Sequence, residues 1–237
     1  MSDEKKSISV ARIFMENLAV AVLIGVAAFG LRAALASDHT AVSPVWPAGG
    51  IALGAALLLG WRVAPGIFLP LVAGSIAAGN PWIFSLLAPL AIVVSVYLGR
   101  WLCRWQKIDL SLPATRDVLL LAGLGVVLPM GFAALGTAGG MVVSGMVPQI
   151  YFSQITGLYW MTNTAGAIVL APVILLLAAG RFSPRHIGVG ATAAGVLQLA
   201  LVLAASWLAF FGSIGSGATG QALAYLPFPF VVWVALS

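Results

Sequence analysis

The stretch SPVWPAGGIALGAALLLGWRVAPGIFLP holds the most distinctive combination of residues in this sequence. Trp46 and Pro47 would open a helix, because proline suits the first helical turn and tryptophan suits a membrane interface. Gly49, Gly50 and Gly54 leave one helix face bare, which allows close approach by a neighbouring helix. A helix that begins this way directs free N–H groups at whatever lies above it, and an anionic or carbonyl group would suit them. The pattern therefore predicts either a ligand pocket lined by Trp46, Pro47, Gly49 and Gly50, or an interfacial anchor followed by tight helix packing.

A second group of polar residues lies in the stretch YWMTNTAGAIVLAPVILL. Trp160, Asn163 and Thr164 have helical spacing, so they could face a common cavity. Polar groups at lipid depth are costly and are functional candidates by default, and Tyr159 adjoins this group. The alternative is hydrogen bonding between helices that holds a bundle together, at about 0.6 kcal/mol for each bond. Arg32, near the end of an earlier apolar segment, would either attract anions at the mouth of the pocket or pair with a nearby aspartate.

Enzymatic chemistry finds little support among the remaining residues. The two histidines, His39 and His186, fall on opposite sides of the membrane in the topology derived below. The sequence has a single cysteine, Cys103, to add to them as a possible metal ligand. Three or four ligands are needed for a zinc centre, and an intramembrane protease needs a serine and a histidine at similar depth. No phosphate-binding glycine loop is present in the sequence. We therefore predict no catalytic residue, no metal site and no cofactor.

These residues are embedded in a chain whose composition requires lipid as its outer solvent. The chain has 237 residues, of which 62% are hydrophobic and 7% are charged, whereas soluble domains average about 25% charged residues. Long apolar runs without strand-like alternation predict helices, which satisfy their own backbone hydrogen bonds in hydrocarbon. The net charge of +5 does not indicate nucleic acid, because the basic residues lie at the ends of apolar runs, where they meet lipid headgroups.

Eight apolar segments are expected, and together they predict an all-α polytopic bundle. The second and third of them, Trp46–Leu59 and Pro65–Gly79, are shorter than the 20 or so residues that a span needs. They would form either two short spans or a re-entrant helical hairpin. The expected segments are Ile13–Ala36, Trp46–Leu59, Pro65–Gly79, Ile83–Cys103, Val118–Leu135, Phe152–Ala179, Gly188–Phe211 and a last one from near Ala222 to Ser237. Residues 1–12 would be a cytosolic segment and residues 13–237 one membrane domain.

The distribution of basic residues predicts the orientation. Ten of the eleven Lys and Arg residues fall on one side of this topology, with only Arg32 near the other, and the expected loops Thr137–Gln149 and Gly212–Gln221 carry none. Basic residues favour the cytosolic side, so both termini are expected in the cytosol. The final apolar run ends without a basic anchor, which predicts that the protein continues into a cytosolic domain.

The quoted motifs resemble those of the MASE1 family. V-W-P-A-G-G-I-A-L with the following L-L-L-G-x-R and P-G-I-F-L is similar to one family signature, and Tyr159–Leu176 is similar to its W-x-x-G-D-A-x-G segment. A weaker likeness covers Leu226–Leu236. Members are integral membrane sensor domains of bacterial histidine kinases, diguanylate cyclases and cyclic-di-GMP phosphodiesterases, with about eight membrane helices. Where the family commonly has Gly-Asp, this chain has Thr162 and Asn163, so a mechanism that needs the carboxylate is in doubt here.

The resemblance implies a sensory input domain in a bacterial inner membrane. It would detect a small ligand or a membrane state and relay it, as a homodimer, to a fused cytosolic output domain. The residues themselves leave two alternatives open. A small-molecule transporter or its substrate-binding subunit would also use a short, glycine-interrupted helix. A membrane anchor that only dimerises an output domain would need no pocket at all.

Overall fold

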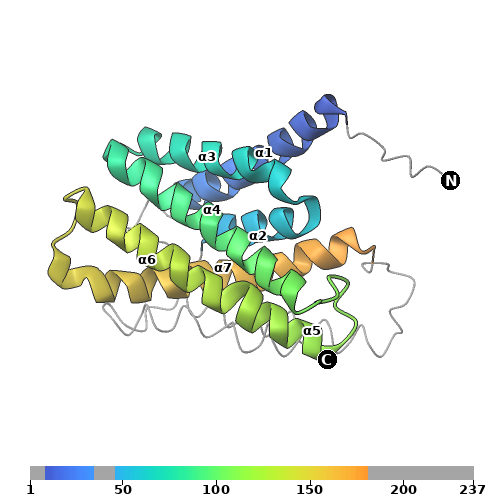
Figure 1. The fold of residues 1–237 in the computed structure, drawn as a ribbon. Coiled ribbons are helices and arrows are strands. Elements are labelled where there is room, and N and C mark those ends of the chain that lie inside the picture. Colours follow the sequence, from blue (N-terminus) through green and yellow to red (C-terminus); the bar gives the residue numbers. More distant parts are fainter. Residues whose placement is uncertain (1–8, 35–45, 181–237) are drawn as a thin grey trace. The chain divides into compact units, whose positions relative to one another are not determined.

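The computed structural model describes residues 9–34 and 46–180, and its regular structure there is entirely helical (Figure 1). The chain divides into two units, Met1–Leu175 and Leu176–Ser237, and the features below belong to the first. The expected seventh and eighth segments, and the motif Leu226–Leu236, lie outside the described residues. The elements in order are α1 (Val10–Ala34), α2 (Pro47–Leu59), η1 (Trp61–Val63), α3 (Ala64–Ala77), α4 (Trp82–Trp105), α5 (Thr115–Leu120), η2 (Leu121–Val127), α6 (Leu128–Val143), η3 (Gln149–Tyr151) and α7 (Phe152–Ala178).

Within these residues, four helical stretches are long and apolar enough to cross a membrane: Val10–Ala28, Trp82–Trp105, Thr115–Val143 and Gln149–Ala178. The all-α membrane architecture expected from the sequence is therefore confirmed. One boundary was wrong, because the segment expected to end at Leu135 continues as α6 to Val143 and shortens the loop expected from Thr137. Gly140 lies inside this extension, where a Cβ would meet Leu87 and Phe84 of α4 at 3.4–3.5 Å, so the small residue serves helix packing.

The two short segments are also confirmed, as α2 with 13 residues and α3 with 14. At 1.5 Å per residue, α2 is about 20 Å long, whereas the 27 residues of α7 extend over about 40 Å. The two helices run in the same direction, because Gly50 of α2 lies against Gly166 and Gly54 lies against Ile174. Consequently α2 accompanies only the second half of α7 and begins beside its middle.

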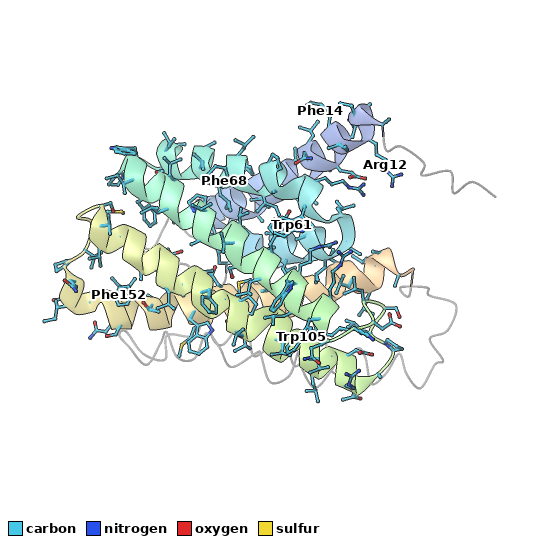
Figure 2. The ribbon with its side chains drawn as sticks, in the orientation of Figure 1. Arg12, Phe14, Trp61, Phe68, Trp105 and Phe152 are labelled. Atoms are coloured by element: carbon cyan, nitrogen blue, oxygen red, sulfur yellow. The ribbon has the colours of Figure 1, made fainter. Side chains whose placement is uncertain are left out.

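One end of the bundle gathers charged residues from α1 and from the turn after α2. Glu16 pairs with Arg12 one helical turn away, at 3.0 Å, and with Arg62 of η1, at 2.9 Å. Arg12 and Phe14 extend from the first turns of α1 (Figure 2), and the Phe14 side chain is 65% exposed. Glu16 thus brings together Arg12 and Arg62, two basic residues that the predicted topology places on the same side of the membrane.

The neighbouring Asn17 joins α1 to the α2–α3 turn through three hydrogen bonds. Its amide Nδ2 donates to the carbonyls of Ile13 and Arg62, at 2.9 and 2.8 Å, and its Oδ1 accepts from the Gly66 N–H at 2.7 Å. Gly66 is packed so closely that a Cβ there would lie 2.6 Å from the Asn17 carbonyl oxygen. The turn is therefore attached to α1 by backbone and side chain alike.

We expect Asn17→Ala to lower the free energy of unfolding by about 1–3 kcal/mol, because it leaves the carbonyl of Arg62 and the N–H of Gly66 without their partner. Reversible unfolding in detergent or bicelles measures the change. Leu18→Ala is the matched control, since Leu18 is the next residue on α1 and is 46% exposed. Equal stability of the two variants would contradict this role for Asn17.

Candidate functional site

The candidate site lies where α2 begins against the middle of α7. The backbone N–H of Trp46 donates to the carbonyl of Thr162 at 3.1 Å. Four residues further along α7, Gly166 is in direct contact with the peptide that joins Trp46 to Pro47: a Cβ on Gly166 would lie 2.5 Å from the Trp46 carbonyl carbon. Thr162 is ten residues from Phe152, so α2 begins about 15 Å along α7. The two sequence motifs thus meet inside the bundle.

The first turn of α2 leaves two backbone donors free. Of the four N–H groups that lack a partner inside any helix, that of Trp46 is taken by Thr162, and Pro47 has none. No side chain caps the helix, and the N–H groups of Ala48 and Gly49 find no acceptor within residues 9–34 and 46–180. Both residues are buried. The positive end of the α2 dipole therefore points at a buried position that favours a hydrogen-bond acceptor.

Asn163 faces this position from α7. It is 3% exposed, and its Oδ1 would lie 3.8 Å from a Cβ built on Gly49, as would the sulfur of Met130 in the first turn of α6. The part of the chain that the structure describes supplies no hydrogen-bond partner for the Asn163 amide. Three polar groups consequently converge here, namely two backbone N–H groups and one side-chain amide.

The glycines of α2 have different surroundings, although the sequence could not distinguish them. A Cβ on Gly50 would lie 2.5 Å from the Gly166 carbonyl oxygen, and one on Gly54 would lie 2.9 Å from Ile174. These two positions require glycine for helix packing, which was the second interpretation of the motif. Around Gly49 the nearest atoms are 3.8 Å away, so an additional methyl group would fit there. The packing interpretation is therefore confirmed at Gly50 and Gly54, whereas the ligand pocket stays a prediction, for which Gly49 is the glycine not needed for packing.

Trp160 lies one turn before Asn163 and contacts the same part of α6. Its indole Nε1 donates to the carbonyl of Val127 at 2.8 Å and would lie 3.5 Å from a Cβ on Gly131. Val127 ends η2, a π-helical segment in the middle of a span, and such segments occur frequently at functional sites. Trp160 is 43% exposed, so it borders the bundle surface while Asn163 is enclosed.

The structure places the other predicted residues less centrally. Thr164 has a buried hydroxyl with no partner among the described residues, and Tyr159 is half-buried. Gln154, another polar residue of this helix, is exposed. Arg32 belongs to the last turns of α1, but its side chain lies outside the described part, as does Gln198 of the expected seventh segment.

Arg100 and Tyr97 of α4 hold the other end of α2, a role that sequence reasoning missed. Arg100 is 7% exposed, and its Nη1 donates to the carbonyls of Ala56 and Leu57, the latter at 2.7 Å. The Tyr97 hydroxyl donates to the carbonyl of Gly60 at 3.1 Å, and its ring stacks on Trp61 with centroids 3.9 Å apart. Trp61 is seen at this turn in Figure 2. A cation at the carboxyl end of a helix neutralises the negative end of its dipole.

The comparisons with known proteins agree with the likeness found in the sequence. The family model MASE1 matches residues 15–237, which is nearly the whole chain. No curated protein and no solved structure matches it. The MASE1 family comprises membrane-associated sensory domains, in agreement with the four apolar helices long enough to span a bilayer in the described residues. The chain therefore belongs to the MASE1 family and is a membrane-embedded sensory domain.

Proposed function

We propose that this domain senses a small ligand that binds where α2 begins, and relays its presence to a fused cytosolic output domain. One observation carries the proposal: a helix starts inside the bundle beside Asn163, which is 3% exposed, and within residues 9–34 and 46–180 neither its first N–H groups nor this side-chain amide has a hydrogen-bond partner. Interrupted membrane helices that start near the middle of the bilayer form binding sites in many membrane proteins. A buried polar cluster with no internal partners is costly unless a ligand or water satisfies it.

The opposite end of α2 supports the relay. Arg100 and Tyr97 attach it to α4, and Asn17 attaches the following turn to α1. A displacement of α2 by a ligand would therefore change the packing of α1 and α4 at the end of the bundle where Arg12, Arg62 and Arg100 lie. A ligand can act as a signal only if it binds the two packings with different affinity.

We further propose that this end faces the cytosol of a bacterial inner membrane, since basic residues are retained on that side. The Arg12–Glu16–Arg62 group and the buried Arg100 lie at the two ends of one short connection, the turn after α2. The family resemblance supports a histidine kinase or a cyclic-di-GMP enzyme as the output domain, acting as a homodimer. The coding sequence that follows Ser237 tests this: a catalytic domain of either class is expected, and a stop codon would contradict the relay.

Asn163→Leu in the full-length protein is expected to weaken the response of the output activity to its stimulus by about tenfold or more, because leaving a buried polar group of the ligand without its partner costs about 1–3 kcal/mol. Basal output activity and the amount of protein in the membrane should stay near wild type. Gln154→Leu makes the same kind of change at an exposed position of α7 and should respond normally. A normal response of Asn163→Leu would refute the sensing site.

A transporter remains the second candidate, because a half-length helix with a free amino end also suits a substrate site. Coupling to an ion gradient generally uses ionisable residues inside the membrane. Of the described side chains in contact with the start of α2, neither Asn163 nor Met130 can ionise, which favours sensing over coupled transport. Uptake into proteoliposomes of the compound that triggers the response would reverse this preference.

A further inference from the structure

We propose that the ligand of this site is a compact molecule that presents a carbonyl or carboxylate oxygen to the N–H groups of Ala48 and Gly49 and to the amide of Asn163. This proposal rests on the proposed function for the role of the site and adds the chemistry of what the site takes. Three features of the first turn of α2 carry it.

The first feature is the pair of neighbouring donors. The N–H groups of Ala48 and Gly49 are consecutive in one helical turn, are buried, and have no acceptor in residues 9–34 and 46–180. Two parallel N–H groups at a helix amino end match one oxygen that accepts twice, or the two oxygens of a carboxylate. A cation or a pure donor would leave both groups unsatisfied and would meet the positive end of the helix dipole.

The second feature is Asn163, which offers both a donor and an acceptor from the opposite helix. Asn163 is 3% exposed, and its Oδ1 would lie 3.8 Å from a Cβ on Gly49. A ligand oxygen bound to the α2 donors would come within reach of the Asn163 amide group. The two N–H donors of α2 would discriminate strongly against analogues that lack an acceptor.

The third feature is the space at Gly49, which limits the size of the ligand. The nearest atoms to a Cβ there are the Asn163 Oδ1 and the Met130 sulfur, both at 3.8 Å, whereas the next glycine is packed against α7. Gly49 is thus the glycine whose missing side chain leaves room for one methyl group beside the donors, in ordinary van der Waals contact with Asn163 and Met130. Gly49→Ala would place a methyl group in that room without displacing backbone.

The test uses this chain in nanodiscs and three probes at equal ionic strength: sodium acetate, acetamide and ethylammonium chloride. Acetate or acetamide is expected to raise the wild-type Tm by about 2–4 °C when present at several times its Kd, and ethylammonium should not. A larger Tm shift with acetate would show that the site prefers a charged oxygen, and a larger shift with acetamide that it prefers a neutral one. Gly49→Ala should keep the unliganded Tm and lose the shift.

Equal shifts in wild type and Gly49→Ala would overturn the proposal, and so would no wild-type shift with either oxygen probe. The outcomes also separate this inference from the sensing role. A Gly49-dependent shift in a protein whose Asn163→Leu variant signals normally would leave the ligand chemistry standing and refute the proposed function. No shift in a protein whose Asn163→Leu variant has lost its response would refute the ligand chemistry alone.

Discussion

Gly166→Ala is expected to cause the largest loss of stability of any single methyl addition in the described helices. The new Cβ would overlap the carbonyl group of Trp46 and would lie 3.1 Å from the Pro47 nitrogen. Backbone atoms cannot rotate away as a flexible side chain can, so α2 and α7 would have to separate. Overpacking of this kind costs about 1–3 kcal/mol and occasionally more. Unfolding in bicelles, or the folded fraction after gentle heating, measures the effect.

Gly157→Ala provides the matched control on the same helix. A Cβ at Gly157 meets nothing within 4 Å, so this variant should be as stable as wild type or gain up to about 1 kcal/mol from helix propensity. If Gly166→Ala were equally well tolerated, the close contact between the start of α2 and the middle of α7 would be wrong. The residues of the candidate site would then not be held together by that contact.

Arg100→Met is expected to lower the stability by a similar amount. The side chain keeps its length and apolar stem, but the carbonyls of Ala56 and Leu57 lose a charged donor that they share. Hydrogen bonds to charged groups contribute about 1.5–3 kcal/mol each, and Ala56 retains a second partner in the Gly60 N–H at 3.0 Å. We therefore expect a loss of about 2–3 kcal/mol, measured by reversible unfolding.

Arg104→Met is its control, because Arg104 lies one turn further along α4 and is exposed. A change within about 0.5 kcal/mol is expected there. The loss of unfolding free energy for Arg100→Lys should lie between those of the two methionine variants, since a lysine keeps the charge but not the planar fork of donors. If Arg100→Met were as stable as Arg104→Met, Arg100 would not hold the carboxyl end of α2.

Much of this fold could be predicted from the sequence because lipid imposes strong rules. The apolar runs predicted the ends of α4 and α7 to within one or two residues. The apolar segments that became α2 and α3 were already too short for a full span, which predicted two short helices. The continuation of α6 beyond Leu135 was missed, because Gly139 and Gly140 suggest a loop in water, whereas a membrane helix accepts glycine for packing.

The two motifs of the site could also be found in the sequence, but their contact could not. Asn163 and Gly49 were each candidates, and only the fold shows that they face one another across α2 and α7. Sequence patterns likewise could not separate Gly49 from Gly50, because helix packing depends on which face a neighbour covers. Arg100 was counted as an orientation signal, since nothing local indicates that its guanidinium turns inward to the end of α2.

Thiol labelling tests the central claim, that α2 begins at a polar site open to small molecules inside the bundle. The native Cys103 is first replaced by serine, and cysteine is then introduced at Gly49 or at Ala52, which is fully buried one turn further along α2. Methyl methanethiosulfonate, a small neutral reagent, is expected to modify the cysteine at position 49 readily and the one at position 52 hardly at all. Equal reactivity, or no reaction at either position, would contradict the claim.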